Sequence, residues 1–151
     1  MILDSSANRM NGTGSDTDST LATANGQIDG AWDFDGANDF VNLGSRQGPQ
    51  KGLTAQAWIR PDDITVSDLI IGARGTGPDY LQFNFQNSGN LIGRIHQSDD
   101  DTILKGRTSG NGVLTQDVLQ SVIFTWDGGT ADASFRLYRN GVRVDTGNTT
   151  L

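Results

Sequence analysis

The side chains best suited to chemistry stand close together in the middle of the chain. His96 is the single histidine, and Arg94 stands two residues before it in a segment that alternates apolar and polar residues. Residues two apart on a strand project from the same face, so both side chains are expected on one face of a sheet. A histidine-dependent triad would need a serine and an aspartate brought to His96 by the fold. Because no nucleophile elbow, phosphate loop, zinc spacing or nucleotide fingerprint occurs, His96 is predicted to be a polar sheet-face residue without a catalytic role.

A run of acidic residues follows this segment. Asp99, Asp100 and Asp101 carry oxygen ligands of the type that a hard cation such as Ca²⁺ binds. Consecutive residues of an extended chain point in alternating directions, so three neighbours rarely reach one ion. The pattern therefore favours a solvated turn, and a calcium site at Asp99 and Asp101 is kept as the weaker interpretation.

The overall charge limits the classes of partner. The chain has 151 residues, eleven basic and eighteen acidic, for a formal net charge of −7 at pH 7. Binding of nucleic acid by phosphate neutralisation is therefore not expected, and an anionic membrane surface is a poor partner. The acidity is equally consistent with a role in solubility.

The acidic residues are all aspartates, and the chain has no glutamate and no cysteine. Glycosidases commonly work with a pair of carboxylates, often glutamates, so the composition disfavours hydrolase chemistry without excluding it. No disulfide can form, and no apolar run is long enough to span a bilayer. The first residues, 1–5, do not form a secretion signal, so any such signal is expected on a longer precursor.

Short alternating segments rich in β-forming residues indicate an all-β fold. In Leu53–Arg60 the apolar residues stand at every second position, and Pro61 then ends the strand. Tyr80–Gln86 alternates in the same way, with apolar residues on the predicted core side and amides on the other. An amide-rich face is typical of sheets that bind sugars, and it is also typical of any solvated sheet face.

Trp58 stands on the polar side of its predicted strand, together with Thr54, Gln56 and Arg60. Packing beneath a covering loop is the favoured interpretation of this tryptophan, and stacking against a ligand is the alternative.

Two hairpins are predicted from turn residues. Ala31–Leu43 is expected to form two short strands joined at Asp35-Gly36, with Trp32 and Phe34 on one face. Asn140-Gly141 lies between two β-rich runs and is the strongest hairpin signal in the chain.

With these segments placed, the chain resembles the laminin-G-like jelly rolls of the concanavalin A-like lectin/glucanase superfamily. The matching motifs occur in the family's order: the Asp4-Ser5-Ser6-Ala7-Asn8 opening, A-x-x-F-D-G-x-x-D-F-V at 31–41, L-T-x-x-A-W-I-R-P at 53–61, Phe124–Gly128 and Leu137–Val142. The resemblance implies a two-sheet antiparallel β-sandwich, built as a single domain over residues 1–151. It also implies a module that binds glycans or proteins outside cells.

Two departures from the family pattern accompany this resemblance. Family members usually carry one more strand before the opening motif and a final strand pair after the Asn-Gly hairpin, so the domain is expected to be truncated at both ends. Missing terminal strands would leave unpaired sheet edges, which invite a second chain. In the related pentraxins, calcium ligands lie partly where Asp79 stands here, but Tyr80 departs from the oxygen-bearing residue expected next.

The sequence thus favours a non-catalytic extracellular or particle-surface module that binds carbohydrate through a sheet face or its rim loops. The residues expected to contact the ligand are Asp79, Tyr80, Arg94 and His96, because arginine and tyrosine offer planar contacts and directional hydrogen bonds to hydroxyls. One alternative is a structural or adhesion domain that forms a homo-oligomer through uncovered sheet edges. Another is a fragment of a polysaccharide hydrolase.

Overall fold

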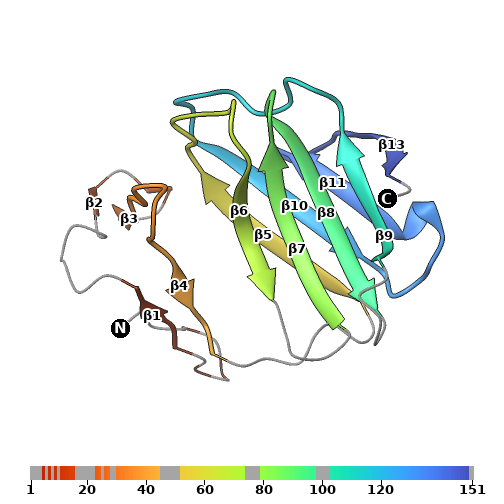
Figure 1. Cartoon of the computed structure of the whole chain (residues 1–151), viewed down its shortest axis with the longest axis horizontal. Helices are drawn as coiled ribbons and strands as arrows, with labels where there is room; N and C mark the ends of the chain where they lie inside the picture. The colour runs from red at the N-terminus through yellow and green to blue at the C-terminus, as the bar shows by residue number, and fades with distance from the viewer. Residues whose placement is uncertain are drawn as a thin grey trace. The chain divides into compact units, whose positions relative to one another are not determined.

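The computed structural model describes residues 5, 7, 9, 11–15, 23–24, 26–27, 30–44, 52–73, 79–97 and 103–149. The chain divides into two compact units, Met1–Arg46 and Gln47–Leu151. Regular structure in the described residues consists of β-strands, apart from one 3₁₀ turn at Asp132–Ser134 (Figure 1). Nothing in this part of the chain forms a helix that could cross a membrane. The prediction of an all-β chain is confirmed.

The first sheet of the second unit has four antiparallel strands in the order β12-β11-β10-β5. These strands are β5 (Leu53–Ile59), β10 (Gln120–Trp126), β11 (Phe135–Arg139) and β12 (Val142–Arg143). In β5, Ala55 is buried on the core side, whereas Thr54, Gln56 and Trp58 are exposed on the other. This is the alternation that the sequence predicts.

The second sheet has five antiparallel strands in the order β13-β9-β8-β7-β6. They are β6 (Asp68–Ala73), β7 (Asp79–Gln86), β8 (Asn90–Gln97), β9 (Ile103–Ser109) and β13 (Asp145–Thr149). The two sheets pack face to face as a sandwich (Figure 1). The two-sheet architecture expected from the sequence is therefore confirmed.

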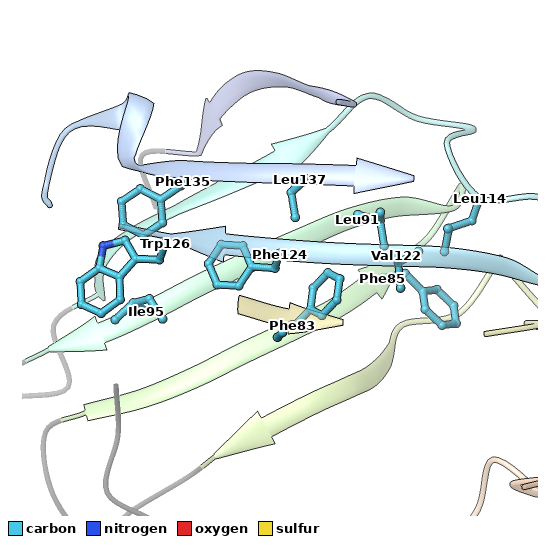
Figure 2. Close-up of a cluster of buried hydrophobic side chains, with 11 residues drawn as sticks. Phe83, Phe85, Leu91, Ile95, Leu114, Val122, Phe124, Trp126, Phe135 and Leu137 are labelled. Carbon is cyan, nitrogen blue, oxygen red and sulfur yellow. The ribbon is translucent and has the colours of Figure 1, made fainter. Parts of the chain in front are cut away.

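Aromatic rings from both sheets fill the core between them (Figure 2). The ring centroid of Phe124 lies 6.0 Å from that of Phe83 and 6.3 Å from that of Phe135. Trp126 stacks on Phe135 with a centroid separation of 6.2 Å. The fully enclosed members of this core are Phe83, Leu91, Ile95, Val122, Phe124, Phe135 and Leu137.

Gly93 on β8 lets the two sheets approach closely at the centre of this core. A Cβ atom at this position would lie 2.3 Å from Cδ2 of Phe124, which is far inside van der Waals contact. The missing side chain therefore leaves the space that the Phe124 ring occupies.

The Asn140-Gly141 turn between β11 and β12 agrees with its sequence signal. Both residues have positive φ, 48° for Asn140 and 78° for Gly141, as a tight hairpin turn of this type requires. The Asn140 side chain also accepts a 2.9 Å hydrogen bond from the backbone N–H of Ser121, which ties the turn to β10.

The first unit corrects the predicted hairpin at Ala31–Leu43. Its strands are β1 (Thr13–Gly14), β2 (Thr23–Ala24), β3 (Gly30–Ala31) and β4 (Val41–Asn42). β3 pairs with β2, and β4 pairs with β1, so the two predicted arms do not pair with each other. The prediction of one hairpin over this segment was wrong.

Local hydrogen bonds explain why residues 32–40 form a loop. Oδ1 of Asp35 accepts hydrogen bonds from the N–H groups of Ala37 (2.8 Å) and Asn38 (3.3 Å), and these bonds lower the pKa of Asp35. The turn keeps the predicted positive φ at Gly36, 73°. A side chain that satisfies successive backbone donors competes with strand pairing, and Ser15 Oγ fixes the far end of the loop by accepting from Phe40 N–H.

Candidate functional site

The pairing of β7 with β8 brings together three of the four residues predicted to contact a ligand. Tyr80 lies directly opposite His96, and the next row on the same face pairs Gln82 with Arg94. Directly opposite residues in an antiparallel pair share one face of the sheet. Tyr80, Arg94 and His96 therefore occupy neighbouring positions on the outer face of the five-stranded sheet.

Asp79 does not share this face. It pairs with Gln97 and alternates with Tyr80, so its position is in phase with the core residues Leu81 and Phe83. The predicted metal ligands Asp99 and Asp101 lie outside the described residues. Within the described ranges, no group of three or more histidine, cysteine and acidic side chains could hold a metal ion.

The space beside Arg94 is provided by a glycine on the neighbouring strand. Arg94 lies opposite Gly106 of β9, and a Cβ atom at Gly106 would come within 2.8 Å of Cγ of Arg94. The arginine stem thus lies across the glycine, and the side chain is half-buried. This arrangement limits the conformations that the guanidinium can adopt on the sheet face.

Further along the same face, the expected solvated amide surface is not observed at Asn84. Asn84 is only 5% exposed, and the residues beside it are Leu69 on β6 and Ile92 on β8. Its amide nitrogen donates a long 3.4 Å hydrogen bond to the carbonyl of Phe85, and its Oδ1 has no partner among the described residues. Aliphatic neighbours on both strands explain why this polar position is buried. An amide on this face is therefore not exposed merely because its strand alternates apolar and polar residues.

The two sheets are joined at one end by a buried carboxylate that the sequence analysis did not identify. The Asp145 side chain is 0% exposed. Its oxygens accept from Nε of Arg107 on β9 at 3.0 Å, from Nε and Nη2 of Arg143 on β12 at 2.8 Å each, and from Leu137 N–H on β11 at 3.2 Å. We call these four residues the Asp145 clasp. The i, i+2 spacing of Arg143 and Asp145 is the sequence signal that could have indicated part of it.

The environment of the clasp controls the ionisation of Asp145. Burial by itself would raise the pKa of this carboxyl group. The hydrogen bonds from Arg143, Leu137 N–H and Arg107, together with the Arg143 charge, outweigh burial and lower the pKa from 3.8 to about 2. Asp145 is therefore ionised at neutral pH and binds the two arginines as a charged group.

The outer face of the four-stranded sheet has a different character. Trp58 is 47% exposed and lies opposite Ser121, and the next row pairs Gln56 with Ile123. The residues that the structure describes do not enclose Trp58, so they do not support the favoured interpretation of packing beneath a covering loop. Stacking of the indole against a ligand, the alternative interpretation, stays a prediction.

Residues 35–151 match the laminin G-like family model of the concanavalin A-like lectin/glucanases superfamily. The chain belongs to this family. No curated protein and no solved structure matches the chain. The resemblance that the sequence motifs indicated is thus confirmed.

Laminin G-like domains generally bind glycans or proteins and are typically extracellular, and the superfamily also includes glucanases. Membership of this laminin G-like family therefore supports a lectin-like or other binding module for this chain. The matched range begins at Asp35 in the first unit and continues through both sheets of the second. The extent of the domain over residues 1–151 stays a prediction.

Proposed function

We propose that this laminin G-like chain is a non-catalytic module that binds glycans outside cells or on a particle surface. Binding takes place on the outer face of the five-stranded sheet, at the end where β7 begins and β8 ends. The observation that carries the proposal is the pair of adjacent rows, Tyr80 opposite His96 and Gln82 opposite Arg94.

The residue types in these rows suit a sugar ring with several hydroxyl groups. Arg94 supplies a planar fork of donors, and Gln82 supplies both a donor and an acceptor. Tyr80 and His96 add ring surfaces and further polar atoms of the kind that pack against a pyranose. A small set of fixed polar groups next to aromatic rings is the usual composition of a site that binds a small polar ligand.

Calcium is an optional part of this proposal. The segment between β8 and β9 carries Asp99 and Asp101, and it starts at the same end of the sheet as His96. A hard cation such as Ca²⁺ held there would bind oxygen atoms, including hydroxyl oxygens of a glycan. Repeating each binding measurement with calcium and with a chelator tests this part separately.

A binding module is favoured over a hydrolase by the composition of the chain. It contains no glutamate, whereas glycoside hydrolysis needs an acid and a second carboxylate held at a defined separation. Hydrolysis of a polysaccharide by the purified chain, lost when one aspartate is replaced, would instead establish the hydrolase alternative.

Glycan-array screening followed by calorimetry with the best glycan tests the proposal. Arg94→Ala is expected to weaken binding roughly tenfold or more, because a hydrogen bond to a charged group is lost. The matched control is Arg136→Ala, since Arg136 is exposed on β11 of the other sheet; its affinity is expected to equal that of the unmodified chain. Silence across the array at high protein concentration, or equal losses for the two arginine variants, would refute the proposal.

A further inference from the structure

The dipeptide Asn-Gly, which deamidates readily in many proteins, occurs four times in the chain, at 11–12, 25–26, 111–112 and 140–141. Glycine has no Cβ atom, so its backbone nitrogen can reach Cγ of the preceding asparagine. When this nitrogen attacks, its proton passes to a solvent base, the C–N bond of the side-chain amide breaks, and ammonia leaves with a proton from water. The resulting succinimide ring adds water and opens to aspartate or isoaspartate.

The second unit contains two of these pairs, both in exposed turns. Asn111 and Gly112 lie between β9 and β10, whereas Asn140 and Gly141 join β11 to β12. Both glycines have positive φ, 71° at Gly112 and 78° at Gly141. A Cβ atom added to either glycine would meet no heavy atom of the described residues within 4 Å, chain neighbours aside. Exposure and glycine conformation are therefore alike in the two pairs, and their hydrogen bonds distinguish them.

Asn140 is held to the neighbouring strand through its backbone and its side chain together. Its N–H donates to the carbonyl of Ser121 at 2.9 Å, and its Oδ1 accepts from the N–H of Ser121 at 2.9 Å. Ser121 is buried in β10 between the enclosed residues Gln120 and Val122. The Asn140 side chain is thus turned toward β10, and moving its Cγ onto the Gly141 nitrogen breaks the hydrogen bond to a buried donor.

Asn111 is restrained less. Within the described residues its side chain makes no hydrogen bond, so it can rotate toward Gly112 without losing one. The attacking N–H of Gly112 donates to the carbonyl of Ser88 at 2.7 Å, and this bond must open, but it joins two exposed turns rather than a turn and a buried strand. Leu114 is buried and keeps the segment in place, so the opening can stay local.

We propose that Asn111 is the deamidation site of the folded second unit, and that the two hydrogen bonds with Ser121 protect Asn140. Deamidation of Asn111 adds a negative charge to a chain whose net charge is already −7. The isoaspartate product also lengthens the backbone of the turn by a methylene group. Since the Gly112 N–H lies in this turn, the product weakens its contact with Ser88 between β7 and β8. This modification does not depend on glycan binding.

Peptide mapping by mass spectrometry tests the proposal on the full chain, incubated at mildly alkaline pH in buffer and in concentrated urea. In urea the two pairs are expected to deamidate at similar rates, because each asparagine is followed by glycine and no folded contact remains. In the folded chain Asn140 is expected to react roughly tenfold or more slowly than Asn111, because reaction requires prior opening of its hydrogen bonds. Equal rates in the folded chain, or faster reaction at Asn140, would overturn the proposal.

Amide hydrogen exchange followed by NMR tests the protective role of Ser121 separately. Asn140→Asp keeps an oxygen acceptor for the Ser121 N–H, and this N–H is expected to exchange as slowly as in the unmodified chain. Asn140→Gly removes the acceptor but tolerates the positive φ of the turn. Exchange of the Ser121 N–H is then expected to accelerate roughly tenfold or more. The same exchange rate in both variants would contradict protection of Asn140 by this hydrogen bond.

Discussion

On the outer face of the four-stranded sheet, the large aromatic Trp58 is half-exposed, although Ser121 directly opposite it is buried. On the outer face of the five-stranded sheet, the amide of Asn84 is buried between Leu69 and Ile92. The residue types alone would have suggested the reverse order of exposure. What decides exposure on these faces is the set of residues on the adjacent strands. A polar residue on a sheet face can therefore mark a binding surface only where its cross-strand neighbours leave it exposed.

The largest expected effect comes from comparing two leucines of the five-stranded sheet, one on its core side and one on its outer face. Leu91→Ala removes a fully enclosed side chain from the core and is expected to lower the free energy of unfolding by about 2–5 kcal/mol. Leu69→Ala, at a 60% exposed position on the outer face, is expected to cost less than about 1 kcal/mol. Urea denaturation measures both values. Similar losses would mean that Leu69 belongs to a second buried layer.

A smaller effect is expected from the clasp that holds the two sheets together. Because the pKa of Asp145 is about 2 when folded and 3.8 when free, the charged carboxylate contributes about 2 kcal/mol of stability. This contribution is complete above pH 3.8 and is lost as the pH falls toward 2. Asp145→Asn is expected to abolish this part of the pH dependence, as followed by urea denaturation between pH 6 and pH 2.

Asp35→Asn provides the control for the clasp. The pKa of Asp35 is also lowered, but its side chain lies on an exposed loop of the first unit. If Asp35→Asn reduced the loss of unfolding free energy between pH 6 and pH 2 as strongly as Asp145→Asn, the clasp would not be the source of the acid sensitivity.

The smallest expected change in stability comes from replacing one amide on each of the two outer faces by leucine. Asn84→Leu replaces a buried amide, whose Oδ1 has no partner among the described residues, by an apolar side chain of similar size. The substitution is expected to stabilise the chain by about 1 kcal/mol. Gln56→Leu, on the exposed face, is expected to change stability by less than about 0.5 kcal/mol. A clear loss of stability for Asn84→Leu would show that this amide makes a hydrogen bond that holds the face together.

The parts of the fold that the sequence predicted are those set by local pattern. The alternation in β5 and β7 identified their core sides, and the Asn140-Gly141 pair identified a turn with positive φ at both residues. Each depends on the geometry of a few consecutive residues. The row of Tyr80 and His96 also follows from pairing successive strands.

What the sequence did not predict depends on contacts between distant residues. The Ala31–Leu43 segment looked like a hairpin, but its two strands pair with β2 and β1. The burial of Asn84 depends on Leu69 and Ile92 in neighbouring strands, and the clasp joins Arg107 to Asp145 across 38 positions. Alternation shows which side of a strand a residue occupies, but it does not show what lies against that side.

The clasp also has a consequence for the conditions that the chain tolerates. Many small extracellular domains fasten their sheets with disulfides, whereas here the fastening is ionic and the chain has no cysteine. A reducing agent therefore has no disulfide to break. Strong acid, in contrast, protonates Asp145 and so removes the negative charge that pairs with both Arg107 and Arg143. The clasp is therefore insensitive to reducing agents and is weakened at low pH, where Asp145 becomes protonated.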